Sequence, residues 1–127
     1  PWVLQRFDAG RSQSAADYID VLEARRRMHD IVHPKMRAFD VLLCPTVPIV
    51  APRLDELEQS DVSNKTNLLV LRNPALVNFL DGCAISIPIH RHGDPPVGLM
   101  LIGAPGQDRR LLAIADQAEA ELQALRG

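Results

Sequence analysis

The sequence predicts an α/β fold in which a short sheet lies among helices, and three observations carry this prediction. Two apolar runs, 84–89 and 97–103, are rich in β-forming residues and are separated by a polar connection that contains glycine and proline. A third apolar run, 40–45, stands upstream and ends at a proline. Two long segments, about 14–37 and 108–125, place apolar residues at helical spacing. Strands interleaved with helices are typical of a layered α/β architecture.

The order and character of the three runs predict how the strands are arranged. A short connection joins 84–89 to 97–103, so these strands should pair antiparallel. A long segment with a helix separates 40–45 from 84–89, so these two should run parallel in one sheet. The last two runs do not alternate cleanly between apolar and polar residues, which predicts that both of their faces are covered.

The first predicted helix, about 14–37, has a start signal and an internal proline. Ser12 or Ser14 can cap it, because a hydroxyl oxygen can accept from the free N–H groups of the first turn. Pro34 should kink the helix rather than end it, which leaves Met36 and Phe39 to pack on the core.

Two further helices are predicted downstream. Asn73 caps well and Pro74 tolerates the first helical position, so a short helix is expected over 74–81. The polar stretch 54–66 before it lacks a sustained period and is interpreted as a surface loop. Asp108 is the predicted cap of the final helix.

Composition limits the classes of function. The 127 residues are 46% hydrophobic and 24% charged, which is ordinary for a globular chain with one modest core. A formal charge of −2 gives no reason to expect nucleic acid or a membrane as a partner, and no run reaches the ~20 apolar residues of a membrane span. Cys44 and Cys83 lie in apolar strands and are interpreted as small buried thiols of a reduced, cytoplasmic protein. The start at Pro1, without a Met, suggests a piece of a longer chain.

Several motifs stand in a fixed order along the chain. They are Arg6, Gly10, Ser14 and Tyr18, then the segment 40–46, then Asn78, then 84–88 and 96–99, and finally Asp108 with Leu111 and Leu112. Together they span nearly the whole chain and resemble the C-terminal region of the amidase signature family, whose members hydrolyse or transfer amides. The resemblance implies a place in the mixed-sheet fold of that family.

That family is known for a Ser-Ser-Lys triad, which lies N-terminal to the region resembled here. This chain has no Ser-Ser pair, and its lysines are Lys35 and Lys65. The resemblance therefore implies that residues 1–127 are the C-terminal segment of an amidase whose catalytic core lies outside this chain. The expected partners are that N-terminal part and a small-molecule amide, with a homo-oligomer left open. The chain alone is predicted to be inactive.

The motifs also depart from the commoner family pattern. Asp81-Gly82-Cys83 stands where Gly-Leu-Pro is usual, and Pro74 stands where a threonine is frequent. These departures are reminiscent of allophanate hydrolases and some bacterial amidases. They give no preference for a glutamine-dependent transamidase component over a general amidase.

The sequence predicts no catalytic residue, metal site or cofactor site within this chain. His29 and His33 share a helix face, as a metal pair must, but Asp30 replaces the glutamate of a zinc protease and a third ligand is missing. They are interpreted as two partly exposed helix histidines. Ser86 lies in a strand interpreted as buried, so its hydroxyl is interpreted as structural.

A substrate pocket is predicted at Pro45, Thr46 and Asn78. Thr46 follows the C-terminal end of a strand, and ligands gather beyond such ends in open α/β sheets. The alternative that Thr46 only closes a turn before Pro48 stays open.

A second hypothesis is a free-standing, non-catalytic α/β interaction or regulatory domain. The sheet edges distinguish the two, because a self-sufficient domain should protect the unpaired edges of such apolar strands.

Overall fold

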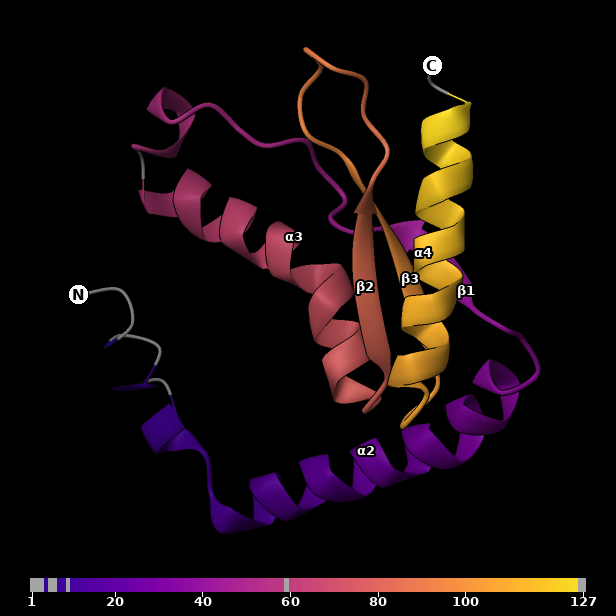
Figure 1. Cartoon of the computed structure of the whole chain (residues 1–127). Coiled ribbons are helices and arrows are strands. Elements are labelled where there is room, and N and C mark those ends of the chain that lie inside the picture. The colour runs from indigo at the N-terminus through magenta and orange to yellow at the C-terminus, as the bar shows by residue number, and fades with distance from the viewer. Residues whose placement is uncertain (1–3, 5–6, 9, 59, 126–127) are drawn as a thin grey trace.

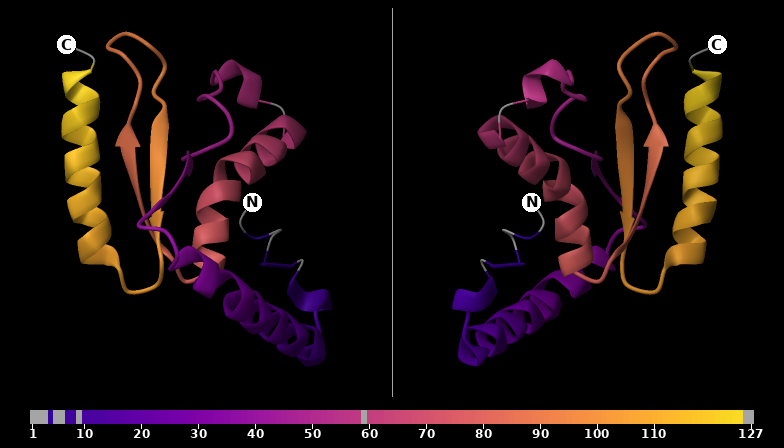
Figure 2. Two further views of the ribbon diagram at one scale, coloured as in Figure 1. Left: turned by 90° about the vertical axis from the view of Figure 1, so that its right-hand side faces the viewer. Right: turned by 90° about the vertical axis from the view of Figure 1, so that its left-hand side faces the viewer.

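The computed structural model describes residues 4, 7–8, 10–58 and 60–125, and Figure 1 shows how their helices and strands are arranged. Arg6 of the N-terminal motif lies outside the described residues. The elements are, in chain order, η1 (Gly10–Ser12), α2 (Ala15–Met36), β1 (Leu42–Pro45), η2 (Asp55–Leu57), α3 (Ser60–Phe79), β2 (Cys83–Pro88), β3 (Gly98–Gly103) and α4 (Asp108–Ala124). Figure 2 shows α4 on one side of the sheet and α3 on the other, so the chain folds in three layers.

The sheet confirms the predicted strand directions. Its order is β1-β3-β2, and β3 pairs antiparallel with both neighbours. β1 and β2 therefore run parallel to each other with β3 between them. The central position of β3 explains why its consecutive residues Met100 and Leu101 are both buried, at 3% and 1% exposure, although they point to opposite faces.

β2 corrects the expectation that both faces of each strand are covered. Its residues alternate between more and less buried positions along the strand. The less exposed face belongs to the core against α4, and the buried members of this core are Ile87, Leu101, Leu111 and Ala115. On the other face Ala84, Ser86 and Pro88 are exposed, because α3 lies against only part of it. We call this second surface the open face of the sheet.

The first helix agrees with its start signal. Ser14 is the N-cap: its Oγ accepts from the N–H of Asp17 at 3.2 Å, and Asp17 accepts in return from the N–H of Ser14 at 2.8 Å. These hydrogen bonds to Ser14 lower the pKa of the Asp17 carboxyl. The helix continues past Pro34 to the buried Met36, as predicted. The expected packing of Phe39 is wrong, since 59% of it is exposed.

The predicted start of the second helix is wrong. α3 begins at Ser60 rather than 74, so the second half of the stretch interpreted as a surface loop is helical and Pro74 lies inside the helix. The side chain of Asn73 does not cap it but donates to the carbonyl oxygen of Pro45 at 2.8 Å. Proline removes one N–H from the helical ladder, and α3 tolerates this loss.

The final helix is confirmed with a shift of its cap. Gln107 holds the N-cap position, without a side-chain hydrogen bond, and Asp108 is the first helical residue. A carboxylate there still interacts favourably with the positive end of the helix dipole.

Large apolar side chains remain exposed on the two long helices in the described part of the chain. They include Tyr18, Ile19, Val21 and Ile31 on α2 and Leu68, Leu71 and Leu76 on α3. Apolar residues on several sides of a helix are typical of a helix buried within a larger protein. None of the helices in the described part of the chain is long and apolar enough to span a membrane.

Candidate functional site

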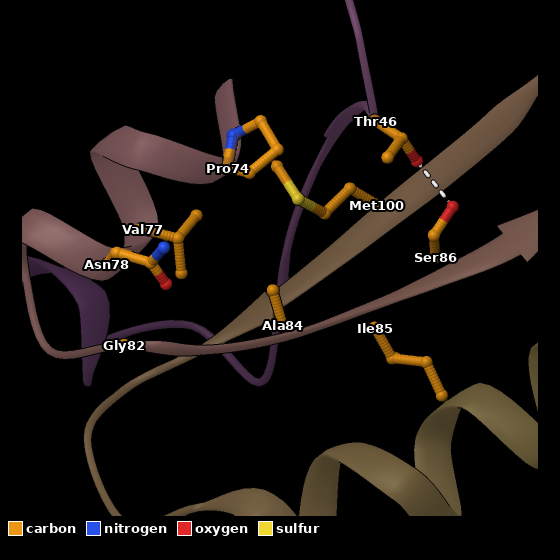
Figure 3. Close-up of a pocket in the computed structure, with 9 residues that line it drawn as sticks. All are labelled: Thr46, Pro74, Val77, Asn78, Gly82, Ala84, Ile85, Ser86 and Met100. Carbon is orange, nitrogen blue, oxygen red and sulfur yellow. Dashed lines mark hydrogen bonds between the residues drawn. The ribbon is translucent and has the colours of Figure 1, made fainter. Parts of the chain in front are cut away.

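Two hydroxyl groups meet over the central strand on the open face. Thr46 directly follows β1, and its N–H donates to the carbonyl oxygen of Gly98 on β3 at 2.9 Å. Its Oγ1 lies 2.5 Å from Oγ of Ser86 on β2, so the two side chains are hydrogen-bonded across β3 (Figure 3). We call Thr46 and Ser86 the hydroxyl pair.

The pair exists because position 98 has no side chain. A Cβ atom at Gly98 would lie 2.6 Å from Oγ1 of Thr46 and closer still to Oγ of Ser86. Contacts of this length between a carbon and an oxygen are strongly repulsive, so any larger residue would force the hydroxyls apart. Gly98 is therefore needed for the space it leaves between the two outer strands.

A pocket of about 280 Å³ lies between α3 and the open face, with the hydroxyl pair at one end. Figure 3 shows Pro74 and Val77 of α3 facing Met100 and Ala84 of the sheet, while the side chain of Ile85 points away toward α4. The residues that line the pocket are Thr46, Pro74, Val77, Asn78, Gly82, Ala84, Ile85, Ser86 and Met100. None of these carries a charge. The pocket is thus mostly apolar, with hydroxyls at one end and the amide of Asn78 at the other.

Two further hollows lie next to the chain segments that follow β1 and precede β3. The second has a volume of about 330 Å³, shares the pair with the first, and includes His90 and Val97. The third, of about 210 Å³, adjoins the second and is lined by apolar residues and Gly98. The hydroxyl pair therefore lies at the boundary of two hollows.

The predicted pocket residues are partly brought together. Thr46 and Asn78 line the same pocket. Pro45 does not belong to its lining, and its carbonyl oxygen instead accepts from Asn73. Sequence reasoning misses Ser86, because the run 84–89 is interpreted there as buried on both sides. The small residues at alternate positions of β2, Ala84 and Ser86, together with Gly98 on its neighbour, are the signal that could have found it.

Three side chains of α2 hold the C-terminal end of α3, which carries Asn78. Arg25 Nε donates to the carbonyl oxygen of Phe79 at 2.8 Å, and its guanidinium also pairs with the Asp81 carboxylate. Nε2 of His29 lies 2.8 Å from the same carbonyl oxygen, and Nε2 of His33 lies 2.7 Å from that of Leu80. We call Arg25, His29 and His33 the helix clamp.

The clamp gives a structural role to the two histidines that the sequence leaves as partly exposed helix residues. Their rings stack 4.6 Å apart, and the His29 side chain is only 18% exposed. Cationic and N–H donors near the last carbonyl groups of a helix satisfy acceptors that have no helical partner. Among the described residues, no group of three or more His, Cys, Asp or Glu could hold a metal ion.

We expect Arg25→Ala to lower the free energy of unfolding by about 1–2 kcal/mol, because a charged donor to the end of α3 is lost. Urea unfolding of the 127-residue chain measures the change. Arg26→Ala is the matched control, since Arg26 is the adjacent arginine and its side chain is exposed. Equal unfolding midpoints for the two variants would show that the contacts of Arg25 do not contribute to stability.

Comparisons with known proteins agree with this fold. Residues 2–112 match the family model described as Amidase. Over 82 residues the chain is 39% identical to 2-amino-5-chloromuconic acid deaminase of Comamonas testosteroni, a match that covers 64% of this chain and 18% of that protein. It is 30% identical to the fatty acid amide hydrolase of Arabidopsis thaliana, covering 89% of this chain and 19% of that protein.

A second type of relative, a component of glutamyl-tRNA(Gln) amidotransferase, appears in both the sequence and the structure comparison. The chain is 30% identical to this component from Sulfurisphaera tokodaii, covering 83% of this chain and 22% of that protein. The crystal structure of the same component from Thermotoga maritima has a TM-score of 0.67 at 22% identity and is similar in fold, over 86% of this chain and 23% of that one. The chain thus spans about a fifth of the length of these relatives. Because the family model matches residues 2–112, most of its length, the chain belongs to the amidase family.

Proposed function

We propose that residues 1–127 form the C-terminal segment of an amidase-family enzyme and supply one wall of its substrate pocket. The complete enzyme would hydrolyse the C–N bond of a small-molecule carboxamide by a Ser-Ser-Lys mechanism whose residues lie outside this chain. The observation that carries the proposal is the pocket on the open face, where Thr46 and Asn78 line a mostly apolar space.

The geometry of Ser86 supports a binding role for this segment rather than a catalytic one. A serine nucleophile needs a base within hydrogen-bonding reach to take its proton. The partner of Ser86 is Thr46, whose hydroxyl is not a base at neutral pH. The chain's two lysines, Lys35 and Lys65, belong to α2 and α3.

The uncovered surfaces support an N-terminal part of the same enzyme as the partner. Within the described residues β1 and β2 each pair only with β3, so each leaves one edge without a strand. Unprotected edges are a liability in a free-standing domain. A further part of the protein would pair these edges and cover the exposed apolar residues of α2 and α3. A cytoplasmic location belongs to this proposal as well, in keeping with two free cysteines.

Thr46→Leu in the complete protein that contains this chain tests the pocket role. Leucine would remove one hydroxyl of the pair and fill the pocket beside Ser86, so we expect kcat/KM to fall by about 10- to 100-fold for bulky acyl groups and less for acetamide. Steady-state kinetics with acetamide, butyramide and benzamide measures the change. Thr66→Leu on α3 is the matched control, because Thr66 lines none of the three hollows. Unchanged kcat and KM for all three amides in Thr46→Leu would reject the pocket role.

A further inference from the structure

We propose that the hydroxyl pair is a binding site for an uncharged carboxamide group, which makes Ser86 a substrate-binding residue. The inference rests on the proposed function, because it names the chemical group that this wall of the pocket recognises. It concerns binding only, with no bond made or broken by either hydroxyl.

The hydroxyl pair keeps hydrogen-bonding groups that a ligand can use. A hydroxyl offers one O–H donor and two acceptor lone pairs. At 2.5 Å between Thr46 Oγ1 and Ser86 Oγ, one hydroxyl donates and the other accepts. The accepting hydroxyl keeps its own O–H, and both oxygens keep lone pairs. The pair can therefore donate to the carbonyl oxygen of a ligand and accept from its N–H.

The hydroxyl pair lies where a ligand in the pocket can reach it. Both residues line the boundary between the first pocket and the second hollow, and Ser86 is exposed on the open face. Between the pair and Asn78 the pocket is lined by the apolar side chains of Pro74, Val77, Ala84 and Met100. A short alkyl or aryl group attached to a bound carboxamide would lie against these side chains and lose contact with water.

The residues of this chain that line the first pocket carry no charge. A carboxylate or an ammonium group lying against this wall of the pocket would give up water without meeting a charge of opposite sign among the residues that line the wall, which is unfavourable. His90 belongs to the second hollow, and its Nδ1 lies 3.3 Å from both the nitrogen and the oxygen of Val97. A neutral carboxamide needs no counter-charge, so the site should prefer it to the corresponding acid.

Saturation-transfer NMR on the complete protein that contains this chain tests the inference, since it observes ligand binding separately from amide turnover. We expect butyramide to bind at least about 3-fold more tightly than butyrate. Thr46→Val and Ser86→Ala should each weaken butyramide binding by about 3- to 10-fold, the value of one neutral hydrogen bond. Thr46→Ser keeps the hydroxyl and should restore most of the affinity.

Thr66→Val is the matched control for removal of a threonine hydroxyl, and circular dichroism of each variant checks that the fold is retained. The inference is overturned if butyramide does not bind, if butyrate binds as tightly as butyramide, or if either Ser86→Ala or Thr46→Val keeps the wild-type affinity for butyramide. These outcomes are separate from failure of the proposed function, which is read from amide turnover by the complete protein. An active amidase whose Ser86→Ala variant keeps the wild-type KM for butyramide would retain the proposed function and reject this inference.

Discussion

The 127-residue chain by itself is expected to hydrolyse simple aliphatic and aryl amides at least about 10⁴-fold more slowly than the complete protein, the scale of losing a nucleophile or its base. Amide cleavage needs a nucleophile, a base and donors to the developing oxyanion. Among the described residues, Ser86 is the serine that lines the candidate pocket, and its hydroxyl is hydrogen-bonded to the hydroxyl of Thr46. Release of ammonia from acetamide and benzamide by the purified chain, beside the complete protein as positive control, measures the difference.

One outcome would contradict this expectation. Turnover by the chain alone that disappears in Ser86→Ala, Lys35→Ala or Lys65→Ala would place the chemistry within these residues. Sedimentation velocity tests a separate expectation: the exposed apolar residues of α2 and α3 should make the isolated chain self-associate. A clean monomer without amidase activity would instead favour a free-standing interaction or regulatory domain.

Gly98→Ala should lower the free energy of unfolding by about 1–3 kcal/mol, the range found for overpacked sites. The added methyl group would press on both hydroxyls of the pair. Thr46 directly follows β1 and Ser86 belongs to β2, and backbone hydrogen bonds set the register of both strands with β3. The strands therefore cannot move apart freely to make room. Urea unfolding of the 127-residue chain measures the loss, and Gly98→Val should lose more.

Gly10→Ala is the matched control for this substitution. A Cβ at Gly10 would meet no atom within 4 Å, so its replacement tests the general effect of glycine removal on the unfolded chain. If Gly98→Ala unfolds at the same urea concentration as Gly10→Ala, the space between the two hydroxyls over β3 does not limit the size of residue 98.

The elements that could be predicted from the sequence are those set by nearby residues. The three strands are predicted to within about two residues, because each is a short apolar run bounded by glycine or proline. α2 and α4 are predicted because capping residues and helical spacing are local signals. The prediction of the second helix is wrong because the local signals there are misleading. The apolar residues of α3 do not form one stripe, and Pro74 resembles a helix start when only its neighbours are considered.

The sequence by itself thus determined the strand directions and two of the three long helices, while the role of Thr46 and Asn78 in a substrate pocket stays a prediction. Only the tertiary structure decided that β3 lies between β1 and β2, and that one face of β2 stays open. It also brought Thr46 to Ser86, 40 residues away, and Arg25 to Phe79, 54 residues away. Such contacts depend on strand order and on the space left at Gly98. No periodicity within a short segment encodes either of these, because both arise when distant segments pack together.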